Sequence, residues 1–277
     1  LFALFTAVAS LPYWEVLAKA VPREERPGLF AAIYMGGGVL AFLAGFGVRA
    51  LLGLDLPFPL GYALLFALGT LAYGAAWYVF GRVEEPEEEV AVGRTDLRLP
   101  LRRPGFRAYL TARLFLGLAG MVEPFYAAYA VRVLGKEAEL GLYLALNALA
   151  FILSNALWSA LARRGAKAVF LGGGVLVLAT PLLALALPPG AFALVFFLQG
   201  AYLAALGIAG NTYLLNLAPP EERTATVGLA NSFLGLFAFS PVLGGWVVGA
   251  WGYGALFLLS AGLAVLGLWA VRRLPEA

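Results

Sequence analysis

A single carboxylate stands in the middle of a long apolar stretch, where a charge is costly. Glu123 lies within residues 108–134, two positions after Met121 and directly before Pro124. A charge at the centre of a membrane-spanning helix costs about 2.5–3.5 kcal/mol, and it persists where it faces a cavity or a partner. Buried carboxylates of this kind often carry protons or bind cations. We therefore predict that Glu123 binds a proton or a cation; a structural pairing with Arg113 is the alternative.

Small residues share the helix face of Glu123. At 100° per residue, this face also carries Ala119, Gly120, Ala127 and Ala130. Tyr126 lies beside it, and Pro124 removes one backbone hydrogen bond, so we expect a bend at this point of the run. Small residues next to a carboxylate favour close helix contact or a narrow cavity.

Other polar side chains within apolar runs are expected mainly to join helices. Asn147 and Asn155 belong to this group, because isolated polar residues in membrane bundles more often bond between helices than bind ligands. Arg113 lies near the end of its run and is expected to reach toward the membrane interface, as long basic side chains do. One face of the run 191–217 carries Gln199, Tyr202 and Tyr213.

The composition places most of the chain in lipid. Of 277 residues, 62% are hydrophobic and 13% are charged, and the mean hydropathy is +0.87. An ordinary soluble domain is about half apolar and a quarter charged. The sequence has no cysteine and no histidine, which excludes thiol nucleophiles, His-based triads and the usual zinc ligands. We therefore predict no cofactor, no metal and no enzyme activity.

Nine apolar runs approach the length that crosses a bilayer, about 20 residues per helix. They are too long for the strands of a membrane barrel and lack its alternation. The runs cover residues 1–20, 29–52, 60–80, 108–134, 139–161, 168–187, 191–217, 225–248 and 254–271. The pattern predicts an all-α integral membrane protein with nine transmembrane helices.

Basic residues gather in alternate connections between these runs. Most of the 19 Lys and Arg residues lie in one set of connections and at the C-terminal end, whereas the opposite set holds Lys136, with Arg49 and Arg132 at helix ends. The positive-inside rule makes the richer side cytoplasmic. We predict that the solvated 81–107 loop and the C-terminus face the cytoplasm of a cell inner (plasma) membrane. Basic residues in alternate loops orient the protein in the membrane and face anionic lipid, and they do not form a continuous patch that would bind nucleic acid.

A short repeat links two distant connections. Pro22-Arg-Glu-Glu-Arg26 and Pro219-Pro-Glu-Glu-Arg223 each follow one long run and precede another. Transporters are often built from such repeats. By the offset between the copies, the counterpart of residue 107 falls about 90 residues before Leu1, which is room for three spans. Since six runs follow the 81–107 loop and three precede it, we expect a plan of six plus six helices with three missing at the front.

Two six-helix bundles joined by a long cytoplasmic loop resemble the major facilitator superfamily of secondary transporters. Residues 162–167 are similar to the second-half copy of the family's basic turn, G-x-x-x-D-R-x-G-R-R, although Ala162 replaces the Asp and Trp158 the first Gly. The matching residues, which the resemblance implies act in gating at this cytoplasmic turn, are Arg163, Gly165 and Lys167. Residues 240–246, followed by Gly252 and Tyr253, resemble the family's eleventh helix.

The resemblance implies a partial two-bundle fold, read as helices four to twelve. Residues 1–80 would be the C-terminal half of the N-terminal bundle, 81–107 the central loop, and 108–277 the C-terminal six-helix bundle. Helices one, four, seven and ten line the central cavity in the family, which selects 1–20, 108–134 and 191–217 here. The residues predicted to bind substrate or protons are Glu123, Tyr126, Gln199 and Tyr202.

The expected function is secondary active transport of a small organic solute by alternating access. A sparsely charged interior with one central carboxylate favours proton-coupled efflux of a hydrophobic or cationic compound. Uptake of a neutral solute such as a sugar is the alternative, and a non-transporting membrane sensor or a channel is an alternative of another class. The expected partners are the solute, the lipid bilayer and protons; nucleic acid is not expected, and the chain is expected to be a monomer.

Overall fold

A computed structural model describes residues 26–84, 100–162, 165–217 and 223–275, together with residues 16 and 20. Every regular element in these ranges is an α-helix or a 3-10 helix. Helices are expected here because a chain in lipid must satisfy its backbone hydrogen bonds internally. The predicted all-α class is therefore confirmed for the described part of the chain.

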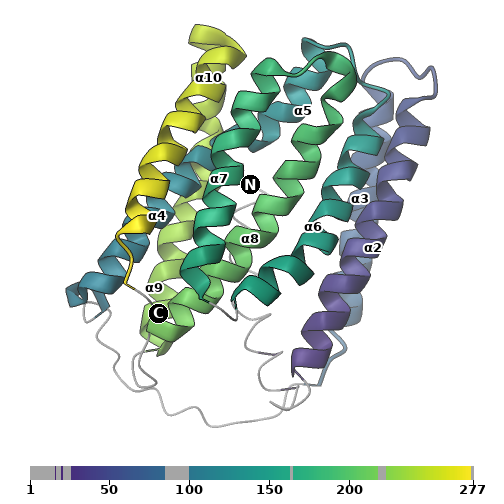
Figure 1. Cartoon of the computed structure of the whole chain (residues 1–277). Helices are drawn as coiled ribbons and strands as arrows, with labels where there is room; N and C mark the ends of the chain where they lie inside the picture. The colour runs from purple at the N-terminus through teal and green to yellow at the C-terminus, as the bar shows by residue number, and fades with distance from the viewer. Residues whose placement is uncertain are drawn as a thin grey trace.

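The helices stand roughly side by side, and successive connections alternate between two ends of the molecule (Figure 1). In Figure 1, the α2–α3 connection lies at the upper end, whereas α4 and α9 begin, and the chain finishes, at the lower end. The α-helices are α2 (Arg26–Leu52), α3 (Leu60–Phe80), α4 (Pro104–Ala119), α5 (Glu123–Arg132), α6 (Leu140–Ala162), α7 (Ala166–Ala186), α8 (Ala193–Leu217), α9 (Arg223–Gly235) and α10 (Ser240–Arg272). The 3-10 turns are η1 (Pro100–Arg102), η2 (Gly120–Val122), η3 (Pro189–Ala191) and η5 (Leu236–Phe239).

Among the described residues, 6 helical segments are long and apolar enough to cross a membrane. They are Leu60–Phe80, Pro104–Arg132, Leu140–Ala162, Ala166–Ala186, Pro189–Leu214 and Thr226–Arg272. The predicted run 1–20 lies outside the described residues apart from positions 16 and 20. The count of nine spans and the six-plus-six plan therefore stay predictions, as does the repeat around Pro22 and Pro219, which also falls mostly outside these ranges.

The last of these segments is interrupted by a glycine. It covers 47 residues, about 70 Å of continuous α-helix, which exceeds twice the hydrocarbon thickness of a bilayer. Gly252 has φ 82 and ψ 176 inside α10, a conformation that residues with a Cβ rarely adopt. The two runs predicted at 225–248 and 254–271 lie on either side of this break.

Helices α2 and α6 touch through their backbones. A Cβ placed on Gly45 would lie 2.7 Å from the Cβ of Ala145, and one placed on Gly141 would overlap the backbone nitrogen of Arg49. Small residues permit this approach, which drives helix association where lipid surrounds both helices. Of the glycines of α2, Gly38 and Gly45 pack closely, whereas nothing lies within 4 Å of the Cβ positions of Gly36, Gly37 and Gly47.

Polar side chains join the helices of the second half. Asn147 donates a hydrogen bond to the carbonyl oxygen of Phe196 at 3.1 Å, which connects α6 to α8 as predicted for this residue. The Ser260 hydroxyl donates to the carbonyl oxygen of Ala119 at 2.7 Å and connects α10 to α4. Among the described residues, Asn155 instead bonds within its own helix, to the carbonyl oxygen of Phe151, and the expected interhelical bond is not found there.

Replacing Gly141 with alanine should loosen the contact between α2 and α6. We expect Gly141→Ala to lower the free energy of unfolding by about 1–3 kcal/mol, because closely packed interfaces tolerate added atoms poorly. Thermal unfolding of the purified protein in detergent, followed by circular dichroism, measures the change. Gly47→Ala is the matched control in α2, since nothing lies within 4 Å of its Cβ position. An unchanged melting temperature for Gly141→Ala would contradict the close contact.

Candidate solute-binding site

Two helices are broken by 3-10 turns that precede prolines. Turn η2 ends directly before α5, whose second residue is Pro124, and turn η5 ends directly before α10, whose second residue is Pro241. Proline has no N–H to donate, so the regular hydrogen-bond ladder cannot pass through either position. Irregular backbone at membrane depth is tolerated where protein covers it or where it lines a cavity. Both prolines line the same cavity.

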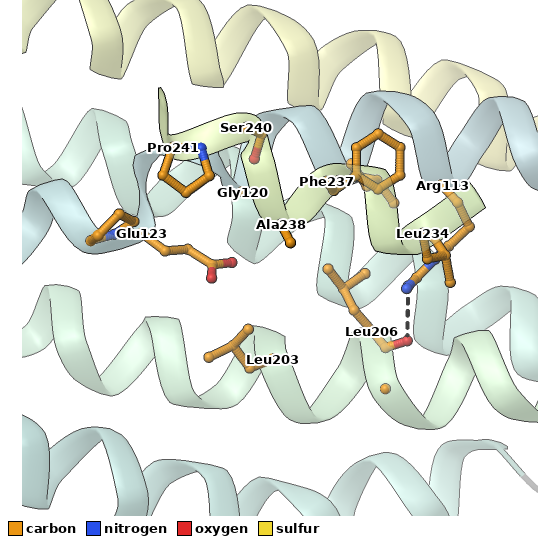
Figure 2. A pocket seen from close by; sticks show the side chains of 14 residues that line it. Arg113, Gly120, Glu123, Leu203, Leu206, Leu234, Phe237, Ala238, Ser240 and Pro241 are labelled. Atoms are coloured by element: carbon orange, nitrogen blue, oxygen red, sulfur yellow. Dashed lines mark hydrogen bonds between the residues drawn. The ribbon is translucent and has the colours of Figure 1, made fainter. Parts of the chain in front are cut away.

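This cavity has a volume of about 480 Å³ and lies among α4, η2, α5, α8, α9 and the η5–α10 junction (Figure 2). Pockets that bind small organic molecules have volumes of about 300–1,000 Å³. Most of its lining is apolar, with side chains that include Leu116, Leu203, Leu206, Leu234 and Phe237. Two ionisable side chains, Arg113 and Glu123, also line it. The cavity therefore combines an apolar body with two charged groups.

Glu123 is the first residue of α5 and points its carboxylate into the cavity (Figure 2). Its Oε1 accepts a hydrogen bond from the hydroxyl of Tyr202 in α8, at 3.3 Å. A Cβ placed on Gly120 would lie 3.1 Å from the same oxygen, so the glycine leaves room for the carboxylate. Tyr202 is buried, with 2% of its surface exposed. This hydrogen bond joins α5 to α8 at the cavity wall.

Arg113 reaches the cavity from α4. Its Nη1 donates a hydrogen bond to the backbone carbonyl oxygen of Leu206 at 3.2 Å (Figure 2). Its Nε is buried and has no hydrogen-bond partner among the described residues. We expected this side chain to reach toward the membrane interface; the structure places it against α8 instead, because a backbone carbonyl and the cavity lie within its reach.

The 3-10 turn places Arg113 and Glu123 on one side of the helix pair. In an unbroken α-helix, ten residues at 100° each would leave the two side chains about 80° apart. The three steps through the 3-10 turn advance about 120° each, which reduces the offset to about 20°. By these ideal values, the 3-10 turn that precedes Pro124 brings Glu123 toward the face that carries Arg113. From the sequence we expected only a bend at this point.

The remaining two predicted binding residues, Tyr126 and Gln199, do not line this cavity. Tyr126 is fully buried with its ring 5.6 Å from that of Phe257, and its hydroxyl has no partner among the described residues. Gln199 is half-buried on α8. Neither side chain lines the 480 Å³ cavity. The structure thus joins two of the four residues, Glu123 and Tyr202, by a hydrogen bond and adds Arg113 to the cavity, a residue that the sequence marked as a charge inside an apolar run and as the alternative partner of Glu123.

The predicted cytoplasmic turn is described in part. Gly165 has φ 146 and stands directly before α7, so a residue with a Cβ would be strained at this position. Lys167 lies in the first turn of α7. Arg163 lies outside the described residues. The gating role of these three residues stays a prediction.

The sequence match to known families agrees with this architecture. The family model of the Major Facilitator Superfamily matches residues 118–277, more than half of the chain. The chain therefore belongs to the Major Facilitator Superfamily, a family of secondary transporters and not of enzymes. It is accordingly a multi-pass membrane protein of a family that binds small solutes within the membrane. A comparison with curated proteins finds no match.

Removing the hydroxyl of Tyr202 should weaken the connection between α5 and α8. We expect Tyr202→Phe to lower the free energy of unfolding by about 1–3 kcal/mol, because the Glu123 carboxylate loses its donor. Tyr126→Phe is the matched control: its hydroxyl is buried without a partner, so its removal should be neutral or stabilising. Thermal unfolding in detergent compares the two variants. Equal melting temperatures would show that the 3.3 Å hydrogen bond contributes nothing to stability.

Proposed function

We propose that the chain is a proton-coupled transporter in which Glu123 binds the proton and the adjoining cavity binds a small organic solute. The observation that carries this proposal is a carboxylate inside the span Pro104–Arg132 that faces a cavity of about 480 Å³. Among the described residues, the Tyr202 hydroxyl is the one donor of a hydrogen bond to the Glu123 side chain. A carboxylate so placed can exchange a proton each time the cavity opens to water.

Efflux of a hydrophobic or cationic compound fits the lining of the cavity better than uptake of a sugar. The apolar side chains suit a hydrophobic body, and the Glu123 carboxylate suits a cationic group. A sugar site would call for several amides and aromatic rings, yet Gln199 lies outside the cavity. In the proposed cycle, solute and proton bind Glu123 in turn, so entry of a proton drives release of the solute.

The proposal extends to the arrangement of the chain in the membrane. Residues 1–80 form three helices of an N-terminal bundle, residues 81–107 the central loop, and residues 108–277 a six-helix bundle. The alternation of connections between two ends (Figure 1) and the break at Gly252 support this division. The basic ends face the cytoplasm of the plasma membrane, where the turn with Arg163, Gly165 and Lys167 gates the cavity, and the chain works as a monomer.

Glu123→Gln should abolish proton coupling, because an amide cannot take up and release a proton at neutral pH. The assay uses the purified chain in proteoliposomes with an imposed pH gradient and the lipophilic cation ethidium as solute. We expect the wild-type protein to concentrate ethidium against its concentration gradient, and a protonophore to abolish this accumulation. In Glu123→Gln, the rate of proton-driven ethidium transport should fall at least about tenfold.

The matched control for this assay is Glu139→Gln. Glu139 lies outside the membrane spans and pairs with Lys136 at 2.9 Å. The hydrogen bond from Lys136 lowers the pKa of the Glu139 carboxyl, so this variant also removes a charged carboxylate, but one away from the cavity. Its coupling should match that of the wild-type protein. Retained coupling in Glu123→Gln would remove the proposed role, and flux that never exceeds equilibrium would indicate a channel.

The membrane orientation can be tested with single cysteines, since the sequence contains none. We expect Ala138→Cys, exposed in the α5–α6 connection, to react with a membrane-impermeant maleimide in intact cells. Glu84→Cys, exposed after α3, should react only after the cells are opened. The reverse pattern would refute the assigned orientation, and labelling of both sites from outside would refute the odd number of spans between them.

A further inference from the structure

The cavity holds two opposite charges that are not paired with each other. Arg113 and Glu123 lie toward opposite ends of it (Figure 2). Arg113 bonds to the backbone oxygen of Leu206, and Glu123 accepts from the hydroxyl of Tyr202. Within the described ranges, neither side chain forms an ion pair. The buried Nε of Arg113 also lacks a partner. Each end of the cavity therefore leaves a charge that a ligand can satisfy.

The energetic cost of these charges selects among ligands. An unpaired charge in a poorly solvated site is unfavourable, and removing one partner of a buried pair is strongly destabilising. A simple cation would satisfy Glu123 and leave Arg113 uncompensated. A simple anion would satisfy Arg113 and leave Glu123 uncompensated, and a neutral solute would leave both charges uncompensated. A molecule that carries an ammonium at one end and an acid group at the other satisfies both and adds no net charge to the membrane interior.

We propose that the solute is a zwitterion whose ammonium group binds Glu123 and whose acid group binds Arg113. Its apolar body lies between them, against Leu203, Leu206 and Phe237, which line the intervening wall. The guanidinium group suits this role because its N–H donors form a planar fork that matches a carboxylate. This inference rests on the proposed function, which places the solute in the cavity, and it narrows the class of that solute.

The spacing of the two charges narrows the class further. The backbone positions of Arg113 and Glu123 are ten residues apart, about 16–17 Å along the helix axis when the three 3-10 steps are included. The side chains between them that face the cavity are apolar, such as Leu116. A zwitterion with its charges at the two ends of an alkyl chain fits this arrangement. An α-amino acid carries both charges on one carbon and covers less of this distance.

Four probes of similar size test the proposal: ε-aminocaproate, its isomer norleucine, hexylamine and hexanoate. Binding is measured by titration calorimetry on the full chain in lipid nanodiscs. We expect the wild-type protein to bind ε-aminocaproate about ten- to a hundredfold more tightly than hexylamine, hexanoate or norleucine, the gain from one added charge-assisted contact. Equal affinity for ε-aminocaproate and hexylamine would overturn the role of Arg113, and equal affinity for norleucine would overturn the separated-charge class.

Variants of Arg113 test whether this residue binds the acid group of the solute. Arg113→Gln should bind ε-aminocaproate no better than hexylamine, while its unchanged affinity for hexylamine shows that the cavity is intact. Arg113→Lys keeps the charge and should retain part of the preference, even if the glutamine variant unfolds. Arg132→Gln is the matched control, because Arg132 is exposed in the last turn of α5 and lies outside the cavity. A full preference in both Arg113 variants would refute the proposal.

The outcomes also separate this inference from the proposed function. In one outcome, proton-driven ethidium transport depends on Glu123, but an acid group on the ligand adds no affinity. That outcome would refute the zwitterion class and leave the coupling role of Glu123 intact. A clear preference for ε-aminocaproate, combined with normal coupling in Glu123→Gln, would refute the coupling role and support the zwitterion site.

Discussion

The structure depends on one constraint: at membrane depth, a polar group without a partner is costly, so backbone and side-chain polar groups mostly bond to neighbouring protein groups or face a cavity. The constraint explains why long apolar runs become helices, in which the backbone satisfies itself. It also explains where the helices break. The irregular turns η2 and η5 border the same cavity, and side chains such as Ser260 and Asn147 bond to carbonyl oxygens of neighbouring helices. The two 3-10 turns η2 and η5 thus mark the cavity.

The hydrogen bond between Tyr202 and Glu123 illustrates how the constraint links packing to chemistry. It fixes the carboxylate at the wall of the cavity while leaving its other side open to a proton or a solute. A helix break places the carboxylate, a glycine leaves room for it, and a buried tyrosine from α8 holds it. A proton-coupled transporter, as proposed here, would need such a group, because the energy of a proton gradient can be used only where binding of proton and solute compete or cooperate.

Much of the membrane plan can be read from the sequence, since it depends on local properties. The apolar runs from 29 onward coincide with helical segments to within a few residues, and Glu123 and Pro124 were recognisable as unusual because a charge and a missing N–H are rare inside an apolar run. Tyr202 could be placed near the cavity by the family resemblance and the helical period. The position of Arg113 was predicted wrongly, because its place near the end of the apolar run 108–134 suggested an interfacial side chain. No sequence rule indicates which carbonyl lies within reach of a long side chain.

Composition and periodicity are enough to specify lipid as the surroundings and helices as the elements. They also specify that one set of connections is richer in Lys and Arg than the other. Each of these properties follows from the residues of one segment at a time. The joint placement of Arg113 and Glu123 required the tertiary structure. It depends on the exchange of three α-helical steps for three 3-10 steps, a rotation of about 60° that α10 supports by packing against η2. Tyr126 and Gln199 were predicted to line the cavity and do not. The helical period assigns a residue to a helix face, whereas the neighbouring helices decide whether that face meets a cavity or a packed core.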